Sequence, residues 1–265
     1  MEIEAAAWEA FPEQAEVRSL ALPSVRVTAG TGETGSRFGG LPWADDRSEW
    51  PRTDDGRPLC LVGLLDCDQV NGWLGGEPLP PGLLLNFFFD ADEQETWGMS
   101  PQDAHYWRIV AADKAQAAPM VAPDGVTVFP AQALDGQPVL TIPHPWEPCI
   151  RQRWAEDSAP ATAYFKLWDT DPAHHRVFGW PELSQGPMQR DCQLVTGGFD
   201  LFEPIDEADP RVLELEQGAE DWRLLWQIDS TDDWMWGDMG KLYFWIRRQD
   251  LAAGRFDRVW ALIQG

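Results

Sequence analysis

Glycine and proline interrupt this chain so often that long helices are not expected in it. The 265 residues include 23 glycines and 22 prolines, which is about 17% against a usual share of about 12%. The apolar runs between them are short. Short apolar runs bounded by turn residues are typical of buried β-strands. The sequence therefore predicts a fold of many short strands and turns.

The apolar runs predict strands over residues 17–27, 59–65, 83–89, 104–110, 126–129, 139–142, 224–228, 242–246 and 259–263. Helical segments are expected over residues 2–14 and 210–217 and from residue 250 onward. Residues 163–168 fit a helix or a strand, and residues 143–160 read as irregular because prolines recur there. A mainly antiparallel α+β fold with short helices follows from this pattern.

Two segments repeat the same order of residue types. Residues 61–66 and 224–229 are apolar runs that end in aspartate. Each is followed by a loop, a glycine and a second run of apolar and aromatic residues. We therefore expect an internal duplication of a strand-loop-strand unit. The predicted organisation is a single domain over 1–265, with halves at 30–142 and 143–265 and an N-terminal extension, 1–29, packed outside the repeated core.

Charge and composition exclude several classes of protein. With 44 acidic against 20 basic residues, the net charge is −24, which disfavours binding to nucleic acid and favours a basic protein partner. The longest stretch without a charged residue is too short and too rich in proline to span a membrane, so no membrane association is expected. The acidic N-terminus lacks the features of a secretory signal, and the expected location is cytoplasmic. The four cysteines form no C-x-x-C pair and are expected to be reduced and mostly buried.

Several motifs in sequence order resemble the YwqG-like family, a set of uncharacterised bacterial proteins. The matching stretches are residues 36–42, 49–52, 56–59, 175–181 with Gln185, 224–230, and 236–246 with 250–251. The family usually has glutamine where Leu64 stands. The resemblance implies a bacterial, β-rich protein with an internal duplication. It also implies a likeness to immunity or partner proteins of toxin systems.

The segment from His175 to Gln185 combines polar and aromatic side chains in a proline-rich stretch. We interpret it as a candidate ligand-binding loop, or else as a structural loop. The chain has 16 tryptophans, which can line a groove or a sugar platform, although most are expected in the core. The predicted ligand-binding residues are His175, Arg176, Trp180, Gln185, Gln227 and Trp236.

Carboxylates gather after both repeated strands. Asp66 and Asp68 share one face if the chain is extended, and Asp229 and Asp238 lie in or beside the corresponding loop. These four residues are weak candidates for a Ca²⁺ or Mg²⁺ site, and for acid-base chemistry. The alternative is that their side-chain oxygens cap turns. No cofactor is expected.

Motifs for catalysis are weak. Residues 30–35 match G-x-G-x-x-G, but the glycines and proline that follow oppose the helix that dinucleotide binding needs. No G-x-S-x-G occurs. The leading hypothesis is a non-enzymatic cytoplasmic binding protein for a basic protein partner, such as an immunity-type protein towards a basic toxin. The alternatives are a small-molecule or carbohydrate binder with a tryptophan-lined pocket, and a carboxylate-dependent hydrolase.

Overall fold

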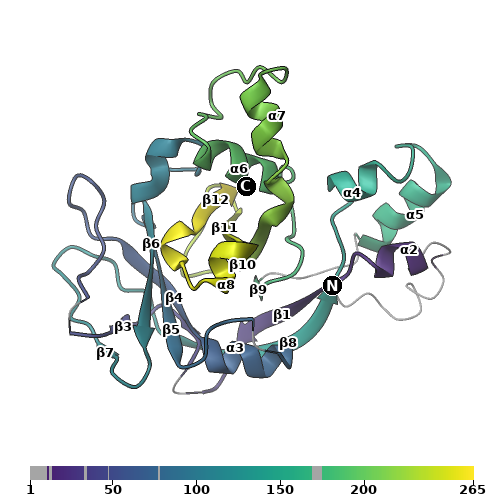
Figure 1. The fold of residues 1–265 in the computed structure, drawn as a ribbon. Helices are drawn as coiled ribbons and strands as arrows, with labels where there is room; N and C mark the ends of the chain where they lie inside the picture. Colours follow the sequence, from purple (N-terminus) through teal and green to yellow (C-terminus); the bar gives the residue numbers. More distant parts are fainter. Residues whose placement is uncertain (1–10, 12–13, 33–34, 47, 77, 169–174) are drawn as a thin grey trace.

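The computed structural model describes residues 11, 14–32, 35–46, 48–76, 78–168 and 175–265. Its main feature is one antiparallel sheet in the order β12-β11-β10-β9-β1-β8-β2-β4-β5-β6 (Figure 1). Two short strands, β3 and β7, pair separately. The strands are β1 (Leu22–Ala29), β2 (Arg37–Phe38), β3 (Trp43–Ala44), β4 (Cys60–Asp66), β5 (Leu83–Phe89), β6 (Trp107–Asp113), β7 (Ala118–Pro119), β8 (Gln132–Thr141), β9 (His175–Val177), β10 (Trp222–Asp229), β11 (Lys241–Arg247) and β12 (Trp260–Gln264).

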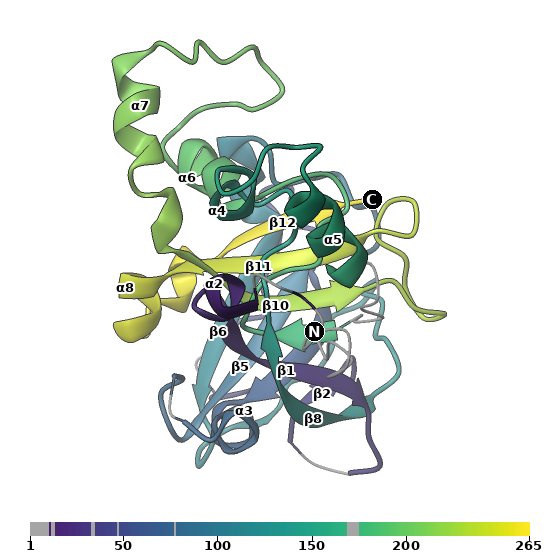
Figure 2. The same ribbon diagram turned by 90° about the vertical axis from the view of Figure 1, so that its right-hand side faces the viewer.

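Short helices surround this sheet. The α-helices are α2 (Gln14–Arg18), α3 (Cys67–Leu74), α4 (Pro148–Arg151), α5 (Ala159–Trp168), α6 (Gln189–Thr196), α7 (Pro210–Glu216) and α8 (Arg248–Ala252), and the 3-10 helices are η1 (Pro101–His105), η2 (Ala219–Asp221) and η3 (Phe256–Arg258). Helix α3 packs on β1, β4, β5 and β8, and α6 packs on β10. Helix α7 and the loop before it project away from the sheet (Figure 2).

The sheet curves until its two outer strands approach each other. The rings of Trp107 in β6 and Trp260 in β12 have centroids 4.7 Å apart. The Trp107 indole N–H donates to the Val259 carbonyl at 3.0 Å. The curved sheet encloses the largest core cluster, whose fully buried aromatic side chains include Trp226, Phe87 and Phe244. Burial of large aromatic rings is the dominant favourable term in such a core.

Strands that lie equally far from the two edges of the sheet correspond to each other. This correspondence extends the predicted duplication to five strands in each repeat. It equates β12 with β6, β11 with β5, β10 with β4, β9 with β2, and β1 with β8. The hydrogen-bond registers agree, because β4·β5 shifts register between Leu61 and Gly63 and β10·β11 shifts between Leu224 and Trp226. These are the same positions of the two repeated runs. The internal duplication is therefore confirmed.

The turns after β2 and β9 also correspond. The Arg37 side chain donates to the Leu41 carbonyl, and the Arg176 side chain donates to the Trp180 carbonyl. The next two residues after each short strand have positive φ: Gly39 and Gly40 after β2, and Phe178 and Gly179 after β9. A phenylalanine at φ +61° is uncommon, and the Phe178 N–H bond to the Leu225 carbonyl holds it there.

The first repeat consists of β1, β2, β4, β5 and β6, and the second consists of β8 to β12. The first strands of the two repeats, β1 and β8, are exchanged between them. Strand β1 pairs with β9 and β8 pairs with β2, so each strand lies beside the second strand of the other repeat. Strands β1 and β8 pair with each other at the centre of the sheet. Strand β1 belongs to residues 1–29, which the sequence assigned to an extension. The division of the chain into a domain, halves and an extension stays a prediction.

Several expected elements differ from the structure. Val17 lies in α2, so the extended segment begins at Leu22 and not at residue 17. Residues 126–129 form no strand, and β8 begins at Gln132 instead. Residues 101–105 form η1, because Pro101 sits at its start and Ser100 and Asp103 form a capping box, so β6 begins at Trp107. Residues 159–168 are a helix, and α6 was not predicted. The expected helix over 2–14 lies mostly outside the described residues.

The helices of the described residues are short. None has the length and apolar character that crossing a bilayer requires.

Candidate functional site

The loop after β9 is tied to its surroundings by its own polar side chains. Arg176 is buried, and its guanidinium donates to the Trp180 carbonyl at 2.8 Å. The Trp180 indole N–H donates to the Leu20 carbonyl at 2.7 Å, and its backbone N–H donates to Thr141 Oγ1 at 2.8 Å. Both side chains therefore have structural partners, and ligand binding by either stays a prediction.

The two predicted glutamines both have hydrogen-bond partners in the structure. Gln227 is fully buried in β10, and its Oε1 accepts from the Glu182 backbone N–H at 2.8 Å. Gln185 is exposed, and its Nε2 donates to the Gly265 carbonyl at 2.8 Å. The Gln185 backbone N–H donates to Gln264 Oε1. The structure thus brings this loop, β10 and the C-terminal end of the chain together.

A mixed-charge cluster surrounds Glu182 and Lys241. The Lys241 ammonium group lies 3.4 Å from Glu182 Oε1 and 3.7 Å from Asp229 Oδ1. Burial raises the pKa of Glu182, whereas Lys241 and Arg176 lower it. Glu182 Oε2 is buried and has no hydrogen-bond partner in the described structure. Sequence reasoning missed Glu182, because its burial depends on strands 40 or more residues away.

His175 is held in a fixed orientation at the start of β9. Its Nδ1 accepts from the Asp229 backbone N–H at 3.0 Å, which makes Nδ1 the unprotonated nitrogen. Its ring centroid lies 4.7 Å from that of Phe38. The side chain also lines a shallow surface hollow with Arg26, Thr28 and Ser230. His175, a predicted ligand-binding residue, therefore borders a surface hollow.

Trp236 is fully buried and packs edge-on against Phe89, with centroids 5.7 Å apart. Trp222, Trp226 and Trp245 are fully buried as well. These four rings are core residues, as expected for most tryptophans. Contact of Trp236 with a ligand stays a prediction.

The carboxylates that follow the repeated strands do not converge. Asp66 caps α3 and lies 2.7 Å from Lys114 Nζ, with Asp68 3.4 Å from the same nitrogen. A hydrogen bond from the Gly82 backbone is the largest cause that lowers the pKa of Asp68, and the hydrogen bond and charge of Lys114 lower it further. Asp229 pairs with Lys241, and Asp238 is exposed. Among the described residues, no group of three His, Cys, Asp or Glu side chains is placed to hold a metal ion.

Three exposed apolar side chains lie on two neighbouring segments, and sequence reasoning did not single them out. We call them the Trp97–Met239 patch, after Trp97, Met235 and Met239, whose exposed fractions are 39%, 50% and 70%. Gln94 joins its two segments: its Nε2 donates to the Met235 carbonyl at 2.7 Å, and its Oε1 accepts from the Gly237 N–H at 3.1 Å. A Cβ at Gly237 would lie 3.1 Å from the Trp97 ring, so the two segments touch.

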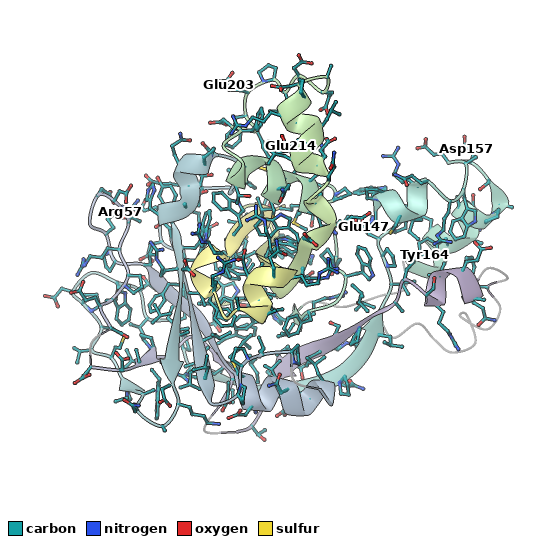
Figure 3. The ribbon with its side chains drawn as sticks, in the orientation of Figure 1. Arg57, Glu147, Asp157, Tyr164, Glu203 and Glu214 are labelled. Carbon is teal, nitrogen blue, oxygen red and sulfur yellow. The ribbon has the colours of Figure 1, made fainter. Side chains whose placement is uncertain are left out.

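Carboxylates are frequent in the two segments that form the Trp97–Met239 patch, and one of them, Glu95, pairs with Arg57. The two segments that form it, residues 92–98 and 231–239, contain no lysine or arginine. They carry the exposed residues Asp92, Glu93, Glu95, Asp232, Asp233 and Asp238. Separate acidic side chains, among them Glu203 and Glu214, occupy the α7 projection (Figure 3). Exposed apolar side chains with acidic neighbours favour contact with a basic protein surface.

The comparison with protein families covers most of the chain. The profile described as "Domain of unknown function (DUF1963)" matches residues 36–264. No curated protein matches the sequence significantly. The matched region begins at the residue before β2 and includes every later strand. The chain therefore belongs to the DUF1963 family of uncharacterised domains.

Proposed function

We propose that this protein binds a basic protein partner through the Trp97–Met239 patch. The observation that carries the proposal is the exposure of one tryptophan and two methionines on two segments that also carry six exposed carboxylates, of which Glu95 pairs with Arg57. Tryptophan contributes strongly to interface hot spots, and methionine adapts to varied partner surfaces. The net charge of −24 would also accelerate encounter with a positively charged partner.

The chemistry of the patch defines the partner. The proposed partner presents lysine or arginine side chains around an apolar group, and this group packs on Trp97 and the two methionines. The resemblance to YwqG-like proteins supports an immunity-type role towards a basic toxin, in a bacterial cytoplasm. These finer assignments are part of the proposal.

A paired capture experiment tests the proposal. The wild-type chain and the double variant Met235→Ser/Met239→Ser are used as baits in lysate of the native host. The matched control is Phe202→Ser/Leu213→Ser, which removes two exposed apolar side chains near or on α7. We expect a basic protein to be retained by wild type and by the control, to be lost from the patch variant, and to be released by salt.

Two results would overturn the proposal. One is a partner retained equally by wild type and by the patch variant. The other is a retained protein without basic character, whose binding does not respond to salt. Direct titration of the purified partner against Asp232→Lys/Asp233→Lys provides a second measurement, in which we expect at least a tenfold weaker affinity.

A further inference from the structure

A second candidate site lies where the outer strands of the sheet approach each other. A cavity of about 290 Å³ opens between β6, β12, η3 and the end of α6. Its apolar walls include Trp107, Ile109, Phe256 and Trp260, all of them buried. This volume is at the small end of the range for ligand pockets. None of the residues that line the cavity belongs to the Trp97–Met239 patch.

Three arginines line this cavity, although the chain as a whole is strongly acidic. They are Arg108 on β6, Arg247 at the end of β11 and Arg258 in η3. Arg108 is exposed and has no ion pair or hydrogen bond from its side chain among the described residues. Arg258 pairs with Asp257 at 3.5 Å, where both side chains are largely exposed and the pair is weak. Arg108 is thus without an ion pair among the described residues, and Arg258 is held only by an exposed pair.

Arg247 is partly buried, and its hydrogen-bond partners are neutral. Its guanidinium donates to Gln193 Oε1 at 3.2 Å and to Thr196 Oγ1 at 2.8 Å, and it lies 4.6 Å from the centre of the Trp222 ring. No carboxylate of the described structure lies within 4 Å of it. Burial is the largest cause that lowers the pKa of Arg247, and the charge of Arg258 lowers it further, although Asp250 and Asp221 oppose both.

Arg37 and Arg176 donate to backbone carbonyls, whereas several other arginines pair with carboxylates. Arg57 pairs with three of them, and Arg190 pairs with Glu207 and Glu216. Desolvated charges are normally paired in this way. Arg247 also lies at the C-terminal end of α6, where a cation is favourable, but that role does not require Arg108 or Arg258. The cavity is therefore lined by three arginines and one carboxylate, Asp257, which pairs with Arg258.

We propose that this cavity binds a small organic anion, with its oxyanion between Arg108, Arg247 and Arg258 and its apolar part against Trp107 and Trp260. A carboxylate and a phosphate ester share this chemistry, since both accept bidentate hydrogen bonds from guanidinium groups. Binding here is independent of the protein partner proposed above.

Calorimetric titration with phenyl phosphate, benzoate and phenol at constant ionic strength tests the site. Phenol has the ring without the anion. We expect one or both anions to bind in the millimolar range or tighter and phenol not to bind. Tighter binding of phenyl phosphate would identify the ligand class as a phosphate ester, and tighter binding of benzoate would identify it as a carboxylate.

Arginine variants locate the binding. Arg108→Ala/Arg258→Ala changes two exposed side chains, so the fold should persist, and thermal unfolding verifies this. We expect at least a tenfold loss of affinity, whereas Arg18→Ala, an exposed arginine on α2, leaves affinity unchanged. The proposal fails if neither anion binds at millimolar concentration, or if the double variant binds as well as Arg18→Ala does.

Discussion

Asp66 and Asp229 occupy equivalent positions at the ends of β4 and β10, and each carboxylate lies within 4 Å of a lysine ammonium group. The pairs are Asp66 with Lys114 at 2.7 Å and Asp229 with Lys241 at 3.7 Å. The two aspartates nevertheless have different roles. Asp66 accepts from the backbone N–H groups of Asp68 and Gln69 and so begins α3. No helix follows Asp229, which accepts from the Ser230 N–H instead.

Removal of the Asp66 cap should destabilise the protein. We expect Asp66→Ala to lower the free energy of unfolding by about 1–2 kcal/mol, because two N–H groups of α3 lose their acceptor. Asp66→Asn keeps a cap oxygen and should cost less. Urea unfolding measures both. Equal losses for the two variants would show that the Lys114 ion pair, and not the cap, provides the stability.

Two glycines with similar backbone angles separate strain from steric clash. Gly179 has φ +76°, and a Cβ there would lie 2.4 Å from Thr141 Oγ1 and 2.6 Å from Ser24 Cβ. Gly82 has φ +72° with nothing within 4 Å of that position. We expect Gly82→Ala to cost about 1 kcal/mol from backbone strain and Gly179→Ala about 3 kcal/mol. Similar midpoints in denaturant unfolding of the two variants would contradict this explanation.

A buried carboxyl makes the stability depend on pH. Glu147 lies at the N-terminus of α4 (Figure 3). Burial raises its pKa to about 7, although a hydrogen bond from Gln189 opposes this. The folded protein therefore holds a proton that the unfolded chain releases near pH 4.5. Stability from this group is complete below pH 4.5, declines as the pH rises to about 7, and stays lost above that. The loss amounts to about 3 kcal/mol.

Glu147→Gln isolates that contribution. Glutamine keeps the shape and an acceptor for Gln189 but does not ionise. We expect the variant to be more stable than wild type at pH 8 and about equally stable at pH 4.5, in urea titrations at each pH. His144 titrates in both proteins, since burial lowers its pKa to about 4, and its effect cancels in the difference. A constant difference across pH would contradict the assignment.

The cysteines should react slowly in the folded protein. All four are free, and burial raises the pKa of Cys60 and Cys67 to about 12 and of Cys149 to about 11. Few thiolates exist at pH 8, and the thiolate is the nucleophile. We expect iodoacetamide to label the native chain far more slowly than the unfolded chain, as counted by intact mass. Labelling of any cysteine at the rate of free cysteine would contradict this.

The fold was predictable where local pattern and burial agree. Strands β4, β5, β10 and β11 are built around apolar runs, and the order of residue types along the chain is enough to indicate their duplication. Strand β8 was only partly predicted, because Asp135, Gly136 and Pro138 make it look like a loop, and its pairing with β1 and β2 determines its conformation. Residues 126–129 have strand-like side chains but no such partner.

The site was less predictable. Polarity singled out Arg176 and Gln227, but their partners, the Trp180 carbonyl and the Glu182 N–H, depend on how the chain returns to the sheet. The Trp97–Met239 patch and the arginine-lined cavity each combine segments more than 100 residues apart. No local pattern in the sequence indicates that such distant segments lie side by side in the fold.

The exchange of β1 and β8 between the two repeats means that neither repeat can complete its own sheet. A fragment with only the first repeat would leave β2 paired with β4 but open on the side where β8 lies, and would leave β1 without both of its partner strands. A second copy of the same fragment could supply the missing strands. The two-strand centre of the present sheet then becomes the twofold axis of a homodimer with interlocked arms. The single chain is thus built like such a dimer, with a covalent linker in place of the subunit boundary.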